Sequence, residues 1–210
     1  KESFVGGLSI INAITNTIVC TLKPRARVSG ILESDGFIGG IAAVAFNKDG
    51  SQVACIAGDI YSSLHVFSTT TGLWDDATCI FSGPVDSKTV SFVTFISDSN
   101  DYHIMTCGEG KGNAGIKFWN IMGKNASCVD AEYAITPAGI TAVTSTNSKY
   151  SCTGHEDGTI VMWEGNTISD AKVVGNHNGA VSALAYVGTD ILISGSTDSI
   201  KLFKKTVTEE

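Results

Sequence analysis

Short runs of alternating apolar and polar residues recur along the chain between residues 40 and 205. In each of four copies, an alternating run is followed by a second apolar run ending near a glycine and a third run ending on an aromatic residue. The first runs are 41–46, 90–95, 140–144 and 181–186; the second are 53–58, 104–108, 150–154 and 191–195; the third are 64–67, 116–119, 160–163 and 200–203. Because alternation with period two places successive side chains on opposite faces of a strand, each copy predicts three short strands.

The copies start at residues 41, 90, 140 and 181, a spacing typical of β-propeller blades. One small sheet cannot bury both of its faces, so such sheets stack around an axis. Glycines at Gly50, Gly72 and Gly158 suit tight hairpins between the strands. We therefore predict an all-β fold with about four and a half blades in one partial propeller domain over residues 1–210. The half blade covers about 4–23, and the full blades cover about 40–82, 90–131, 139–174 and 180–208.

Composition agrees with a packed chain and narrows the range of partners. Hydrophobic residues make up 43% and charged residues 17%, enough apolar material for a core, and the net charge of −7 disfavours non-specific binding to nucleic acids or anionic membranes. No apolar run is long enough for a membrane span, and the first residues lack both an initiator Met and a signal-peptide core. We expect a cytoplasmic fragment of a larger propeller, completed by further sequence or by a second chain.

The six cysteines are expected to be free thiols. Three fall in second-strand runs (Cys55, Cys107, Cys152) and three in predicted fourth-strand segments (Cys20, Cys79, Cys128), without any CxxC pair. Long, unpaired spacings of this kind are typical of small residues in a reducing compartment. No metal site or cofactor is therefore predicted.

A set of polar residues recurs at matching positions of the copies and carries a family resemblance. The fourth copy offers His177, Ser194 and Asp198, with Phe203 closing the third run; the third offers Thr153, Asp157 and Trp163, with Pro137 and Ala138 where a histidine would lie; the second keeps Thr106 and Trp119, and the first has Asp59 and Phe67. These residues resemble the blades of WD-repeat propellers, in which a loop His, a strand Ser or Thr, a hairpin Asp and a Trp form a structural hydrogen-bonded set.

The order of several longer motifs resembles a narrower group. Residues 59–63 precede a His-Val-Phe run, 105–108 lead to the run at 115–119, and 153–165 are followed by 175–179. Together they are similar to the tandem propeller of the echinoderm microtubule-associated protein-like (EMAP-like) proteins over about residues 4–205. The resemblance implies a cytoskeletal role, with tubulin or microtubules as partners.

Enzymatic interpretations find little support in the motifs. The glycine-rich stretch 108–115 is followed by a strand, whereas a phosphate-binding loop needs a following helix and a Lys-Ser/Thr pair. His155, Glu156 and Asp157 are residue types that suit a metal or acid–base site, but they lie in a predicted hairpin, where Asp157 is expected to be structural and His155 and Glu156 to be exposed. The hairpin interpretation is preferred.

The sequence thus predicts a non-catalytic protein-interaction scaffold. Candidate protein-binding residues lie in the hairpins between second and third strands: Asp59, Tyr61, Glu109, Lys111, His155, Glu156 and Thr197. Rigid propellers present such loops as a docking surface. Two alternatives remain open: an adaptor of another complex, in ubiquitin ligation, trafficking or ciliary assembly, and a hydrolase with its site on the propeller axis.

Overall fold

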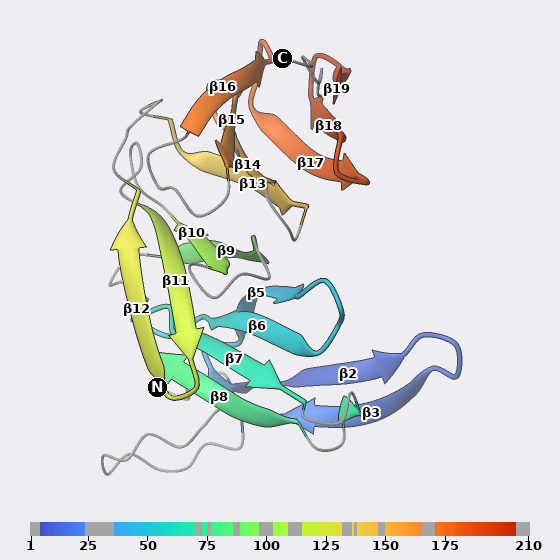
Figure 1. The fold of residues 1–210 in the computed structure, drawn as a ribbon, viewed down its shortest axis with the longest axis vertical. Coiled ribbons are helices and arrows are strands. Elements are labelled where there is room, and N and C mark those ends of the chain that lie inside the picture. Colours follow the sequence, from blue (N-terminus) through green and yellow to red (C-terminus); the bar gives the residue numbers. More distant parts are fainter. Residues whose placement is uncertain are drawn as a thin grey trace, which may run out of the picture.

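Antiparallel sheets follow one another along an open arc (Figure 1). The computed structural model describes residues 5–23, 36–69, 73–74, 77–85, 89–96, 103–108, 115–131, 136, 138–146, 150–164 and 171–204. Within these ranges every extended regular element is a β-strand. The predicted all-β propeller fold is therefore confirmed, with four blade-like sheets in sequence order.

Each predicted blade is one sheet whose strands pair in chain order. The first contains β5 (Ile41–Phe46), β6 (Gln52–Ala57), β7 (Leu64–Ser68) and β8 (Thr78–Gly83). The second contains β9 (Val90–Phe95), β10 (Ile104–Gly108), β11 (Ile116–Met122) and β12 (Asn125–Asp130). The third contains β13 (Ile140–Ser145), β14 (Tyr150–His155), β15 (Thr159–Glu164) and β16 (Ala171–Asn176), and the fourth has β17 (Val181–Val187), β18 (Ile191–Ser196) and β19 (Ile200–Lys204).

A smaller N-terminal portion precedes these sheets. The hairpin of β2 (Leu8–Asn12) and β3 (Thr17–Leu22) stands where the last two strands of a preceding blade would be. A two-residue pair, β1 (Val5–Gly6) with β4 (Phe37–Ile38), joins the chain ahead of the first blade. The hairpin and the fourth sheet lie at opposite ends of the arc (Figure 1).

Alternation along each strand supplies the apolar layers between successive sheets. Leu64 and Ile104 are fully buried where the first sheet meets the second, and the first strands β5, β9, β13 and β17 contact one another in turn. Trp119 and Trp163 point back toward the preceding sheet, where their rings lie 6.2 Å from Phe81 and 5.8 Å from Phe118. Full burial of one such aliphatic side chain contributes about 1.5–3 kcal/mol. These layers between sheets are therefore the main source of stability.

One glycine position shows how closely the blades are joined. Gly158 ends the hairpin of the third sheet with φ of 88°, and a Cβ there would stand 2.2 Å from the carbonyl oxygen of His177. A larger residue would therefore meet both backbone strain and the connection to the next sheet. The sequence places glycine where the third and fourth sheets make backbone contact.

The six cysteines are free, as expected from their spacing. Cys55, Cys107 and Cys152 are buried, and Cys128 is exposed. Burial raises the pKa of the Cys55 and Cys152 thiols to about 12, which keeps them protonated and unreactive near neutral pH.

Neither a membrane-spanning helix nor a metal-binding cluster occurs among the described residues. They contain no helix long and apolar enough to cross a membrane. They also contain no group of three or more His, Cys, Asp or Glu side chains placed to hold a metal ion.

Candidate functional site

The connections between strands emerge alternately on two faces of the arc because neighbouring strands are antiparallel. Hairpins between second and third strands share a face with the links between one blade and the next. Two backbone hydrogen bonds show this directly: Val85 N donates to the Tyr61 carbonyl at 3.2 Å, and His177 N donates to the Gly158 carbonyl at 3.0 Å. We call this surface, formed by residues 58–63, 84–85, 156–158, 177–180 and 197–199, the hairpin face.

The hairpin of the first sheet is held by its own polar side chains. The Asp59 carboxylate accepts hydrogen bonds from Tyr61 N at 3.0 Å, Ser63 N at 3.0 Å and Ser63 Oγ at 2.7 Å. Ser62, with φ of 47°, accepts a hydrogen bond from Val90 N at 3.1 Å, which ties the loop to the second sheet. Asp59 is thus occupied within the loop. Ile60 and Tyr61 stay 78% and 45% exposed.

The second sheet keeps a short polar pair below this face. Trp119 Nε1 donates to Thr106 Oγ1 at 2.9 Å, and both residues are buried. The predicted binding residues Glu109 and Lys111 lie outside the described residues.

The third sheet contains a hydrogen-bonded chain in which a histidine has an unexpected origin. Trp163 Nε1 donates to Thr153 Oγ1 at 3.1 Å, and this oxygen lies 2.9 Å from His155 Nε2. His155 Nδ1 lies 3.1 Å from the Ala138 carbonyl oxygen, which can only accept. Nδ1 must therefore carry the imidazole hydrogen and donate it to the carbonyl, which leaves Nε2 to accept a hydrogen bond from the Thr153 hydroxyl.

The expectation that His155 is an exposed loop residue is wrong, because only 2% of it is exposed. The residue ends β14, and its ring lies against the connection at Ala138, at the point where the fourth copy has His177 from its preceding link. Burial lowers the pKa of His155, and the Ala138 carbonyl and the Asp157 charge partly oppose that shift. His155 is therefore an interior residue of the third blade. Glu156 beside it is exposed, as predicted.

Asp157 holds the same hairpin through different partners. Its carboxylate accepts hydrogen bonds from Thr136 Oγ1 at 2.5 Å and from Thr159 N at 2.9 Å. Burial would raise the pKa of Asp157, but these hydrogen bonds outweigh it and the pKa is lowered. Asp157 thus binds the link that enters the third sheet at Thr136. These hydrogen bonds do not involve Trp163 or Thr153.

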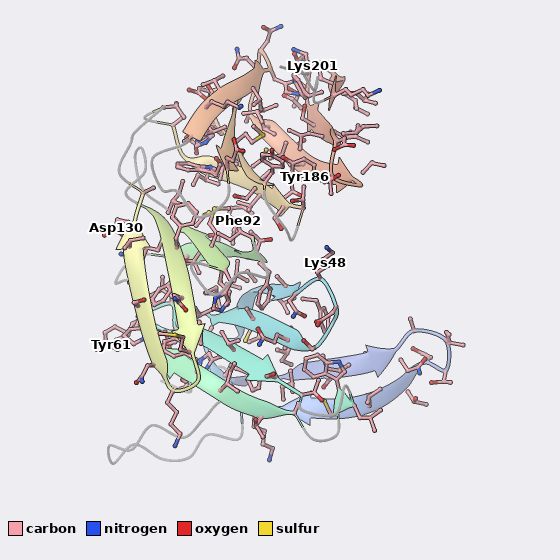
Figure 2. All side chains as sticks on the ribbon, viewed as in Figure 1. Lys48, Tyr61, Phe92, Asp130, Tyr186 and Lys201 are labelled. Atoms are coloured by element: carbon pink, nitrogen blue, oxygen red, sulfur yellow. The ribbon has the colours of Figure 1, made fainter. Side chains whose placement is uncertain are left out.

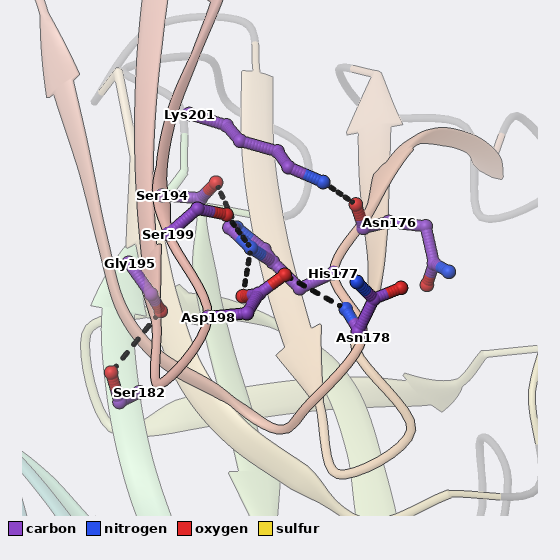
Figure 3. A network of polar contacts seen from close by, with 9 residues as sticks. All are labelled: Asn176, His177, Asn178, Ser182, Ser194, Gly195, Asp198, Ser199 and Lys201. Carbon is purple, nitrogen blue, oxygen red and sulfur yellow. Dashed lines mark hydrogen bonds and ion pairs between the residues drawn. The ribbon is translucent and has the colours of Figure 1, made fainter.

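The fourth sheet brings together the three residues expected from sequence (Figure 3). His177 Nε2 lies 2.7 Å from Ser194 Oγ, and His177 Nδ1 lies 2.9 Å from Asp198 Oδ1. Asn178 N donates to the second carboxylate oxygen at 3.2 Å. The hydrogen bond from the Asn178 amide is the largest effect on Asp198, and together with the weaker effects of the His177 ring and Ser196 it outweighs burial and lowers the pKa to about 2. Thr197, a predicted binding residue, is exposed in the same hairpin.

These Ser, His and Asp side chains form a set of the types used in nucleophilic catalysis, but their burial differs from that of a working nucleophile. Ser194 and His177 are each 1% exposed, so the hydroxyl has no open side for a substrate. The contacts instead tie a strand, a link and a hairpin to one another. This arrangement can fix the shape of the hairpin face.

A cleft of about 700 Å³ lies between the third and fourth sheets. Met162, Tyr186 and Phe203 line it together with residues of both sheet edges. The Tyr186 hydroxyl lies 3.1 Å from the Cys152 thiol. Burial raises the pKa of both groups, so neither is primed for acid–base work.

Sequence reasoning missed three residues in or next to these hairpins. Ile60 was not singled out, although an apolar residue beside a tyrosine in a polar loop is a detectable sign of a contact surface. Thr136 and the structural use of His155 were also missed. His155 lies two residues after Thr153, close enough for its imidazole to contact the Thr153 hydroxyl. That contact can be recognised only once it is known that β14 ends at His155.

The folded sheets and their polar sets define this chain as a β-propeller-type protein with four blade-like sheets. No protein-family model matches the sequence, and neither does any curated protein. Two computationally designed proteins of known crystal structure are similar in fold. Ika4 is 23% identical with a TM-score of 0.57, and the match covers 81% of this chain and 94% of Ika4. Ika8 is 20% identical with a TM-score of 0.61, and the match covers 93% of this chain and 52% of Ika8, so this chain spans about half of its length.

Proposed function

We propose that this protein is a non-catalytic interaction scaffold that docks a protein partner on its hairpin face. The observation that carries the proposal is the pair Ile60 and Tyr61, exposed at the tip of a loop whose backbone is fixed by Asp59 and Ser62. A rigid loop loses little conformational entropy on binding, and tyrosine is enriched among residues that dominate binding energy. Tyr61 can be followed in Figure 2.

The finer assignment rests on the sequence motifs. The hydrogen-bonded sets of the third and fourth sheets support a WD-repeat type of blade, with His155 replacing the link histidine in the third. Resemblance to the EMAP-like propellers supports a microtubule-associated role in the cytoplasm. Tubulin in microtubules is therefore the partner that we propose to test first.

Co-sedimentation of the 210-residue chain with microtubules tests this function. We expect the wild-type chain to pellet with microtubules, and the Ile60→Asp/Tyr61→Ala variant to bind at least about tenfold more weakly, as for loss of a binding hot spot. Ile14→Ala is the matched control, because Ile14 is 95% exposed in the β2–β3 turn, away from the hairpin face. A wild-type chain that stays in the supernatant contradicts the microtubule role and moves the search to other adaptor partners.

A further inference from the structure

We propose that two copies of this chain close into a twofold ring, in which the last sheet of each copy packs on the first strands of the other. The inference goes beyond the hairpin face, since it concerns the two ends of the arc. It rests on two bare apolar surfaces of complementary kind. We call them the following face, on β17–β19, and the preceding face, on β5 and β2–β3.

The following face is exposed in the fourth sheet although its residue pattern matches that of the buried layers. Pairing in register places Ala185, Ile193 and Leu202 on one side of this sheet, opposite the side of Leu192, which packs toward the third sheet. Ile200 is 74% exposed and Leu202 is 68% exposed.

Residues at the equivalent positions of the other three sheets are buried under a neighbouring sheet. Ile200 corresponds to Leu64, Ile116 and Ile160, each at or next to the start of its third strand, and each of those three is 0% exposed. Each is covered by the sheet that follows it along the chain. An aliphatic residue at the equivalent position of the fourth sheet, Ile200, is therefore expected to be buried by a further sheet.

The preceding face is bare for the opposite reason. β5 turns Ala43 and Ala45 toward the second sheet, so Val44 and Phe46 point the other way, where they are 51% and 45% exposed. The β2–β3 hairpin replaces only the outer half of a preceding blade, and its packing partners lie mainly on β6, β7 and β8. On the far side of that hairpin, Ile11 and Ile18 pair in register and are 55% and 65% exposed.

A second copy supplies the missing half of both junctions at once. Every junction between the described sheets joins a following face to a preceding face. One exposed face of each kind remains, and the elements that carry the two faces lie at opposite ends of the arc (Figure 1). Residues 5–22 contain no charged side chain, so charge does not oppose their burial. In Ika8, a match to 93% of this chain leaves about as much chain again, which is the amount a second copy provides. Contacts of this head-to-tail type close into a ring when related by a twofold axis.

Light scattering coupled to size exclusion tests the ring on the 210-residue chain. We expect a single species of twice 21.9 kDa that neither grows nor dissociates over a wide range of concentration. Leu202→Lys and, separately, Val44→Lys should each weaken association by about 100-fold or more, because either lysine would be buried without a partner. Met122→Lys is the matched control, since Met122 is 66% exposed on an internal sheet.

Mixing the two single variants separates this ring from other assemblies. The mixture retains one intact junction, between the sound following face of Val44→Lys and the sound preceding face of Leu202→Lys, so a mixed dimer should reappear. A dimer lost in Leu202→Lys but unchanged in Val44→Lys would indicate symmetric pairing of the last sheets and overturn the proposal. Monomers of the wild-type chain, or polymers that lengthen with concentration, would overturn it as well.

Discussion

In both the third and the fourth sheet, a hydroxyl at the equivalent position of the second strand is hydrogen-bonded to a histidine, but the two histidines come from different places in the chain. In the fourth sheet, His177 comes from the link before the sheet and reaches Ser194 at 2.7 Å. In the third, that link offers no histidine, and His155 at the end of the second strand reaches Thr153 at 2.9 Å. The position of the ring relative to the strand hydroxyl is kept while its sequence origin changes.

The partners on the other side of each ring differ in charge. His177 Nδ1 faces the Asp198 carboxylate, whereas His155 Nδ1 faces the neutral carbonyl of Ala138. A carboxylate can accept a hydrogen bond from either a neutral or a charged ring, whereas around His155 the effect of burial outweighs that of the Ala138 carbonyl and favours the neutral form. The comparison teaches that an imidazole at this point can be held by a carboxylate or by a backbone carbonyl, and that in the third sheet the hairpin aspartate binds Thr136 instead of the ring.

Removal of either ring is expected to have the largest effect. His155→Ala and His177→Ala should each lower the free energy of unfolding by about 2–4 kcal/mol, because each leaves a cavity and a buried hydroxyl without its partner. Urea unfolding at one fixed protein concentration measures both. Glu156→Ala, at an exposed neighbour, should change stability by less than about 0.5 kcal/mol. If only His177→Ala is costly, the two rings are not equivalent.

The sequence predicts most of the fold because successive side chains of a strand lie on opposite faces, which produces a recognisable pattern of residue types. The runs at 90–95 and 160–163 correspond to strands whose alternate side chains fill successive layers. The pair β1–β4 was not predicted, since two-residue strands have no periodicity to detect.

The polar sets likewise include one part that the sequence predicts and one part that it does not. His177, Ser194 and Asp198 are recognisable because their spacing matches a repeated scheme. His155 and its contact with Ala138 were missed because they depend on a ring folding back beneath a link, which requires the strands to be placed first.

Loss of the indole N–H is expected to have a smaller effect and tests whether the third sheet can imitate the fourth. Trp163→Phe gives the third sheet the aromatic type that Phe203 provides in the fourth. It should cost about 1–3 kcal/mol, from one hydrogen bond to Thr153 and a partly filled cavity. Trp119→Phe should cost at least as much, because no imidazole is described on its acceptor Thr106. Urea midpoints of the two variants decide the order, and a cheaper Trp119→Phe would contradict it.

The neutral ring of His155 should make stability depend on mildly acidic pH. Its folded-state pKa is lowered from 6.5, chiefly by burial, so the unfolded chain takes up a proton first as the pH falls. Stability is therefore highest above 6.5 and declines as the pH drops from there toward the folded-state pKa, with a slope of at most about 1.4 kcal/mol per pH unit for one group. His155→Gln should flatten that part of the profile. An unchanged slope in the variant would show that His155 is not the titrating group.

The smallest expected effect concerns Asp198 at strongly acidic pH. Its folded-state pKa of about 2 lies below the ordinary 3.8, because Asn178 N and His177 Nδ1 donate to its carboxylate. The stabilisation is therefore present above 3.8 and is lost as the pH falls through about 2. Asp198→Asn should be less stable than the wild-type chain at neutral pH, and the gap should close between those two values. Asp190→Asn, in the turn before β18, is the control. A gap that persists below pH 2 would mean that Asp198 acts through its shape, whereas a closing gap assigns the effect to the charge that orients His177.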